Sequence, residues 1–98
     1  MVHISPMEQF HAGDLVEVPC DIQAGPFPDE KLVTVETEDG RVISGFVKTD
    51  YLNEDRNTVL AKILAVSGDD IQLRLLGSFF TTALGFASVS HGRITKAA

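Results

Sequence analysis

The sequence has very little cysteine, no tryptophan and no long apolar run. Because Cys20 is the only cysteine, no disulfide can form within the chain. No apolar stretch approaches the roughly 20 residues that a membrane-spanning helix requires. Residues 1–6 also lack the basic and apolar regions of a signal peptide. These absences predict a cytoplasmic protein that does not associate with membranes.

Basic residues are scarce as well. The 98 residues include 8 Lys and Arg against 14 Asp and Glu, which gives a formal net charge of −6. Residues 1–55 hold twelve acids and three bases, whereas residues 56–98 hold two acids and five bases. Surfaces that bind nucleic acid or anionic lipid need clustered Lys and Arg, so neither partner is expected. We interpret the asymmetry as a solvated acidic face; the alternative is complementary faces that steer a basic partner or a second copy.

Apolar residues make up 44% of the chain, which is enough to predict one folded domain spanning residues 1–98. Near the N-terminus, Ser5-Pro6-Met7-Glu8 has the spacing of a capping box. Gly13 follows where a helix end often needs a left-handed residue. This pattern predicts a short helix over residues 6–12, and the last residues, 93–98, are expected to form a frayed tail.

Most of the remaining chain has the period-two alternation of β-strands. Residues 14–20 alternate, and Pro19 predicts an edge or an end there. Residues 21–30 are rich in proline and glycine and are expected to form a stiff loop. Residues 31–38 and 41–48 alternate around Asp39-Gly40, which predicts a hairpin with a type I′ turn. Gly45 predicts a bulge or a bend in the return strand.

The next segments are less uniform. Residues 49–57 are polar and predict a connection. Residues 58–67 fit a helical face as well as a strand, and we favour a strand because a turn at 68–70 leads directly into the clean alternation of 71–75. So apolar a strand would be buried on both faces. Residues 85–90 predict a last short strand.

Together these elements predict a mainly all-β fold with a short N-terminal helix. Five or six short antiparallel strands over residues 14–90 would curl into a small barrel, which leaves few exposed edges. The order of strands and loops, with Gly13-Asp14-Leu15-Val16-Glu17-Val18 as an opening strand, resembles that of SH3-like barrels. The resemblance concerns the fold alone. The chain lacks tryptophan, so the proline-binding groove of signalling SH3 domains is not expected.

No residue pattern predicts catalysis, a metal site or a cofactor, so we expect a protein that is not an enzyme. A reactive cysteine needs a lowered thiol pKa, whereas the charge of Asp21 would raise that of Cys20. Cys20 is therefore expected to be a small buried residue. The histidines lack the short spacing of metal ligands. Four carboxylate pairs fall in expected turns, where water keeps them ionised. The histidines are His3, His11 and His91, and the carboxylate pairs are Asp29-Glu30, Glu38-Asp39, Glu54-Asp55 and Asp69-Asp70.

Adjacent Phe79 and Phe80 are the least explained feature. Neighbouring residues of a strand point in opposite directions, so one of the two is hard to bury. With Phe27 and Tyr51 they could form an exposed apolar patch of the kind that marks interfaces. We therefore predict a non-catalytic module that binds a protein partner or assembles with itself as a homo-oligomer through these four residues.

Two alternatives remain open at this point. One is a small-ligand-binding or enzymatic barrel, with its site between the loops 21–30 and 49–57 and with acids such as Asp29 or Asp50 as polar contacts. The other is nucleic-acid binding, which the charge disfavours. It would require the five bases of the second half to converge on one surface: Arg56, Lys62, Arg74, Arg93 and Lys96.

Overall fold

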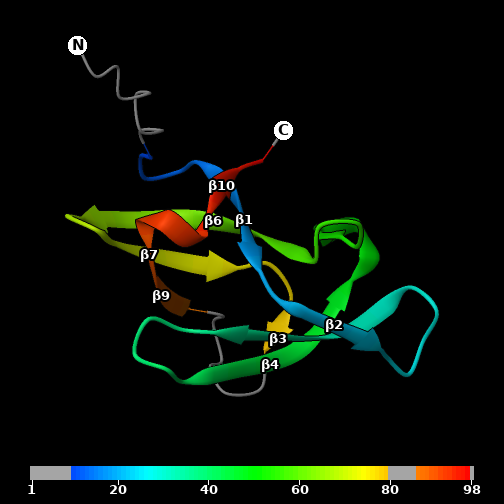
Figure 1. The fold of residues 1–98 in the computed structure, drawn as a ribbon. Helices are drawn as coiled ribbons and strands as arrows, with labels where there is room; N and C mark the ends of the chain where they lie inside the picture. The colour runs from blue at the N-terminus through cyan, green and yellow to red at the C-terminus, as the bar shows by residue number, and fades with distance from the viewer. Residues whose placement is uncertain (1–9, 80–85, 98) are drawn as a thin grey trace, which may run out of the picture.

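The computed structural model describes residues 10–79 and 86–97, which form two antiparallel sheets (Figure 1). In the first sheet the strand order is β10–β1–β6–β7–β9, and β5 pairs with the beginning of β6. In the second sheet the order is β2–β3–β4–β8. The first sheet contains β1 (Leu15–Pro19), β5 (Leu52–Asn53), β6 (Thr58–Ser67), β7 (Asp70–Leu75), β9 (Phe86–Ser90) and β10 (Thr95–Lys96). The second contains β2 (Asp21–Ala24), β3 (Glu30–Glu36), β4 (Val42–Lys48) and β8 (Ser78–Phe79).

The core lies between the two sheets. Strand β1 continues into β2 after the single residue Cys20, so one segment of chain serves both sheets (Figure 1). Alternate residues of β1, β6, β7 and β9 meet those of β3 and β4 in one apolar cluster. The prediction of a mainly β, antiparallel fold is therefore confirmed. The closed barrel is not found among the described residues, because the strands divide into two separately paired sheets. The fully buried side chains are Val16, Val18, Val33, Val35, Val47, Val59, Ile63, Ile71, Leu73, Leu75 and Val89.

The helix predicted over residues 6–12 is not found in its described part. Residues 10–12 are not helical, and residues 6–9 lie outside the described residues. Gly13 has the expected positive φ of 95°, but it closes a turn instead of a helix: Asp14 N–H donates to the His11 carbonyl over 3.1 Å. The carboxylate of Asp14 also stabilises this turn, because it accepts a hydrogen bond from His11 N–H over 2.9 Å. Within the described chain no helix has the length and apolar character needed to cross a bilayer.

The hairpin expected around Asp39-Gly40 is confirmed as β3 and β4, but the turn type is not. Of the two turn residues only Gly40 has a positive φ, 82°, whereas a type I′ turn needs positive φ at both. Gly40 N–H donates to the Thr37 carbonyl and Thr37 N–H to that of Arg41, which closes a longer loop. The register from Glu36 to Glu30 runs without a shift past Gly45, so the predicted bulge is not there.

Residues 58–67 form the expected strand, β6, but it is not buried on both faces. Lys62 and Leu64 are exposed because only the inner face of the first sheet is covered by the second. The register shift of this sheet lies in β6 itself, between Ile63 and Ala65. The turn at 68–70 therefore predicted the strand correctly, whereas the apolar composition of the segment predicted its burial incorrectly.

Three segments expected to be irregular contain strands, one of them the connection 49–57, where Leu52–Asn53 form β5. Residues 21–24, assigned to a loop, pair with β3 as β2, because Ile22 sits opposite Val33 and packs on the core. In the predicted tail 93–98, Ile94 is buried and β10 pairs with β1. In β2 and β10 a single half-buried or buried apolar residue supplies too little periodicity to be recognised in the sequence.

Candidate functional site

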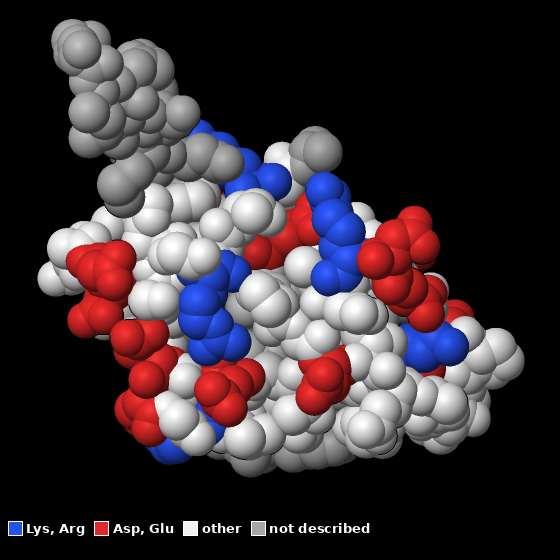
Figure 2. All heavy atoms as spheres, viewed as in Figure 1, with Lys and Arg blue, Asp and Glu red and all other residues white. Residues whose placement is uncertain are grey.

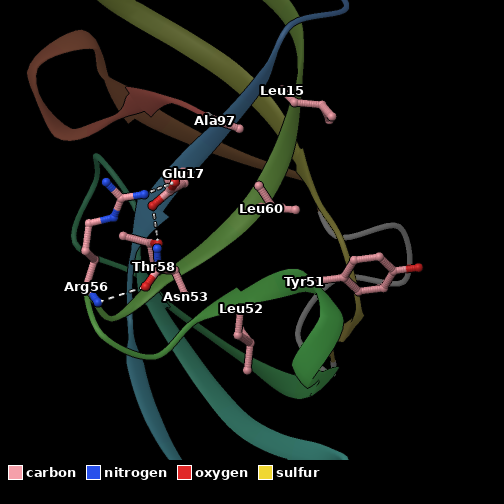
Figure 3. A pocket seen from close by; sticks show the side chains of 9 residues that line it. All are labelled: Leu15, Glu17, Tyr51, Leu52, Asn53, Arg56, Thr58, Leu60 and Ala97. Atoms are coloured by element: carbon pink, nitrogen blue, oxygen red, sulfur yellow. Dashed lines mark hydrogen bonds and ion pairs between the residues drawn. The ribbon is translucent and has the colours of Figure 1, made fainter.

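A pocket of about 330 Å³ opens on the outer face of the first sheet. Its floor is formed by β1 and β6, and its wall by the short helix η1 (Thr49–Tyr51), β5 and the turn that follows (Figure 3). The volume is at the lower end of the range for ligand pockets. The lining residues are Leu15, Glu17, Tyr51, Leu52, Asn53, Arg56, Thr58, Leu60 and Ala97.

One end of the pocket is polar and centres on the carboxylate of Glu17 (Figure 3). The Glu17 side chain is only 7% exposed, yet both oxygens have a partner. Arg56 Nη2 donates to Oε2 over 2.8 Å, and Thr58 Oγ1 donates to Oε1 over 2.6 Å. Since burying an unpaired charge is costly, this pairing explains how the sheet tolerates a buried acid.

The local backbone explains why these residues meet. Glu17 points outward from β1, as the alternation predicts, and its Cα lies opposite Leu60 of β6 and Thr95 of β10. The turn from β5 to β6 then folds over it. Asn53 Oδ1 accepts from Arg56 N–H over 3.1 Å, and Asn57 takes a positive φ of 53°. The turn thereby fixes the backbone of Arg56 beside the buried carboxylate.

The guanidinium of Arg56 remains accessible. Its side chain is 59% exposed, and among the described residues no second acceptor is assigned to its other N–H groups. A guanidinium has five donors in a fixed fork, so most of its donor capacity faces solvent. Arg56 is therefore both the counter-ion of Glu17 and an open donor at the mouth of the pocket.

The other end of the pocket is apolar. Leu15 and Leu60 form its floor, and Leu52 and the ring of Tyr51 stand at its wall (Figure 3). Leu15 and Tyr51 are among the exposed large apolar residues of the protein. A side chain with an apolar body and a polar group beside it would match this division.

The four predicted interface residues have different fates. Phe27 and Tyr51 are exposed, as expected. Their loops lie side by side, because Thr49 N–H donates to the Asp29 carbonyl over 2.9 Å. Phe79 lies in β8 with its Cα opposite Gly45, and Phe80 lies outside the described residues. The structure thus brings together the segments of two of the four.

The alternative prediction, a site between loops 21–30 and 49–57, agrees with the position of the pocket only in part. The pocket takes four residues from 49–57 and none from 21–30. Asp29 and Asp50, the acids suggested as polar contacts, are exposed and do not line it. The acid that does line the pocket, Glu17, was missed, because the alternation places it on the outer face and outer acids are normally solvated. The one hint in the sequence of a polar group beside this acid was Thr58, which the alternation places on the same face as Leu60.

The cysteine, the histidines, the paired carboxylates and the basic residues considered in the sequence form no site in the described part of the chain. Burial raises the pKa of the Cys20 thiol to about 12, and Asp21 adds to this effect. No group of three metal-ligating side chains occurs within residues 10–79 and 86–97, and His3 lies outside them. Two carboxylate pairs, Glu38-Asp39 and Glu54-Asp55, lie in exposed turns as predicted; in the other two the second residue, Glu30 or Asp70, begins a strand. On the face seen in Figure 2, basic side chains occur singly between acidic ones and form no continuous basic surface.

Comparison of the chain with protein-family models, curated proteins and solved structures finds no match. The functional argument therefore starts from the pocket and from the outer face of the first sheet.

Proposed function

We propose that the chain is a non-catalytic module that binds a segment of another protein at the Tyr51 pocket, the cavity lined by Tyr51, Leu60, Glu17 and their neighbours. The observation that carries this proposal is the division of the pocket into an apolar floor and one exposed guanidinium. Interfaces are enriched in Tyr and Arg, which anchor a partner in desolvated pockets. Tyr51 and Arg56 stand at the mouth of the cavity in these roles.

The arrangement of Glu17 favours binding over catalysis. A general acid or base needs a carboxyl group that can reach the substrate and exchange a proton with it. Here one carboxylate oxygen accepts from Arg56 and the other from Thr58, so both are engaged in hydrogen bonds within the protein. The role this supports for Glu17 is to hold Arg56 in place.

The fold of the module is proposed to be a variant of the SH3-like barrel. The support is the passage of β1 directly into β2, which joins the two sheets at one side as a barrel strand would. The comparison is one of strand arrangement and implies no shared ligand.

Selection of peptides tests the function. Random peptides displayed on phage are selected on the immobilised protein, and their affinities are measured for wild type, Tyr51→Ser and Val42→Ser. Val42 is an exposed apolar residue of the second sheet that does not line the pocket, and it serves as the control. Loss of an aromatic anchor should weaken binding about tenfold in Tyr51→Ser, and Val42→Ser should bind as wild type.

Two results would count against the proposal. One is a selection that enriches no peptide; the other is equal affinity for wild type and Tyr51→Ser. Light scattering on the same preparation measures self-assembly: a mass above the 10.6 kDa of one chain, restored to 10.6 kDa by Tyr51→Ser, would identify the bound segment as part of a second copy.

A further inference from the structure

A row of four exposed residues crosses the outer face of the first sheet. The Cα of Leu15 in β1 lies opposite Lys62 in β6, Lys62 opposite Arg74 in β7, and Arg74 opposite Phe86 in β9. All four side chains are exposed, Leu15 by 49% and Phe86 by 48%. Because paired residues of an antiparallel sheet point to the same side, the row reads apolar, basic, basic, apolar on one surface.

The two central residues, Lys62 and Arg74, carry like charges at directly opposite positions. Like charges directly opposite on neighbouring strands destabilise a sheet. Neither Lys62 nor Arg74 forms an ion pair with any described residue. The chain as a whole carries a net charge of −6, yet neither cation is paired with an acid; Glu17, two residues from Leu15 on the same face, is paired with Arg56. A local cost that the rest of the sequence does not relieve is expected at functional surfaces.

A hollow lies at each end of the row. Leu15 lines the Tyr51 pocket, of about 330 Å³, and Phe86 lines a second hollow of about 300 Å³. The second hollow is bordered by Leu64, Gln72 and Ser88, and Leu64 is exposed where β6 shifts its register. Both hollows are partly apolar: the Tyr51 pocket also holds Glu17 and Arg56 at its polar end, and Arg41 also lines the second hollow. Lys62 and Arg74 lie between them without an ion pair to any described residue.

We infer that this row, Leu15–Lys62–Arg74–Phe86, is the docking site of an acidic amphipathic helix of a partner protein. This inference rests on the proposed function and names the chemistry of its partner. The cations call for carboxylates, and the hollows call for an apolar side chain on either side of them.

The spacing of the row selects a helix over an extended strand. Neighbouring strands lie about 4.8 Å apart, so the ends of the row are about 14 Å apart. A helix rises about 1.5 Å per residue and covers that distance in about 10 residues. Residues three or four apart on one helix face are separated by about 5–6 Å, which matches the cations. In an extended chain, side chains of one face recur only every ~6.6 Å, too far apart to meet each strand.

Other occupants fit less well. In a two-fold contact between copies the row would face itself, which would place Lys62 against Arg74 or its own equivalent. Nucleic acid would meet two cations flanked by apolar residues on a chain of net charge −6. Both occupants are nevertheless distinguishable outcomes of the test.

The probe is a synthetic Ala-based helical peptide with the pattern L-x-x-E-x-x-x-E-x-x-L, labelled for fluorescence anisotropy, together with its E→Q analogue. Titration with wild-type protein should give saturable binding, about tenfold weaker for the Gln peptide. The variant Lys62→Gln/Arg74→Gln should lose the preference for Glu, and Phe86→Ser should weaken both peptides. Lys48→Gln, which removes an exposed cation of the second sheet, is the matched control and should behave as wild type.

The outcomes separate this inference from the proposed function. Equal binding of the two peptides, or a Glu preference that survives in Lys62→Gln/Arg74→Gln, would overturn it. If neither peptide binds while phage selection yields peptides that depend on Tyr51, the helix site is wrong and the binding module stands. A doubled mass that falls in Phe86→Ser, or tighter binding of a single-stranded oligonucleotide, would overturn it in favour of a second copy or a nucleic acid.

Discussion

Replacing Arg56 by methionine tests whether the buried carboxylate of Glu17 depends on its ion pair. The Arg56→Met variant keeps an apolar stem of similar reach and removes the guanidinium. The carboxylate then keeps Thr58 as its donor but loses the cation that holds Oε2 at 2.8 Å. A matched control exists, because Arg41 Nε and Asp39 Oδ2 also lie 2.8 Å apart, with side chains 79% and 57% exposed.

The size of the effect follows from the difference in burial. Removing one partner of a fully buried pair costs about 3–5 kcal/mol, and leaving a buried acceptor without a partner costs about 1–3 kcal/mol. Glu17 is buried, but Arg56 is 59% exposed, so water can approach Oε2 once the guanidinium is gone. We therefore expect Arg56→Met to lower the free energy of unfolding by about 1–2 kcal/mol. The exposed pair is screened by solvent, so Arg41→Met should have little effect.

Thermal unfolding followed by far-ultraviolet circular dichroism measures the difference, since the chain has no tryptophan and its one tyrosine lies at the pocket. For a domain of this size about 1 kcal/mol corresponds to a Tm shift of about 4–8 °C. In a Glu17→Gln background the charge to be paired is absent, so Arg56→Met should cost less there. Equal, small shifts for Arg56→Met and Arg41→Met would refute the reasoning, as would an undiminished cost of Arg56→Met in the Glu17→Gln background.

Three further variants or groups give independent predictions. Cys20 is half-buried and its thiol pKa is raised to about 12, so its thiolate fraction at pH 8 is smaller in the folded protein, and iodoacetamide should alkylate it markedly more slowly than in urea. Equal rates in the two states would contradict this protection. The hydrogen bond from Thr37 is the main cause that lowers the pKa of Asp39, followed in part by Arg41, so Thr37→Val should raise that pKa in an NMR titration, whereas Thr34→Val should not. The stabilisation linked to Asp39 is present above its ordinary pKa and should be lost as the pH falls through the lowered one. A Cβ on Gly25 would lie 2.4 Å from the Glu30 carbonyl oxygen, so Gly25→Ala should lower stability by about 1–3 kcal/mol in urea unfolding, whereas Gly92→Ala, with open space, should not.

Period-two alternation was informative where several apolar residues share one face. Val33, Val35 and Thr37 are all buried, as their spacing predicts, and the hairpin that follows them is in place. The method failed for β2 and β10, where one half-buried or buried residue holds a short strand against its neighbour. Strands of this kind are defined by pairing with a distant segment, and pairing leaves no periodic trace in four or fewer residues.

The candidate site was harder to predict than the fold for a related reason. Tyr51 could be proposed from the sequence because an aromatic residue in a polar loop is conspicuous. Glu17 could not, since its burial depends on a turn 39 residues away in the chain that brings Arg56 over it. The row from Leu15 to Phe86 likewise exists only through the register of four strands.

The Glu17–Arg56 ion pair also affects the charge beside the row Leu15–Lys62–Arg74–Phe86. Glu17 lies on the outer face two residues from Leu15; its charge is compensated by Arg56, and it forms no ion pair with Lys62 or Arg74. Were Glu17 unpaired, it would repel the carboxylates of an acidic partner at the Leu15 end. Arg56 thus compensates a negative charge beside the row in addition to pairing the buried carboxylate of β1. It follows that Arg56→Met should weaken the Glu peptide more than the Gln peptide, although Arg56 itself is not part of the row.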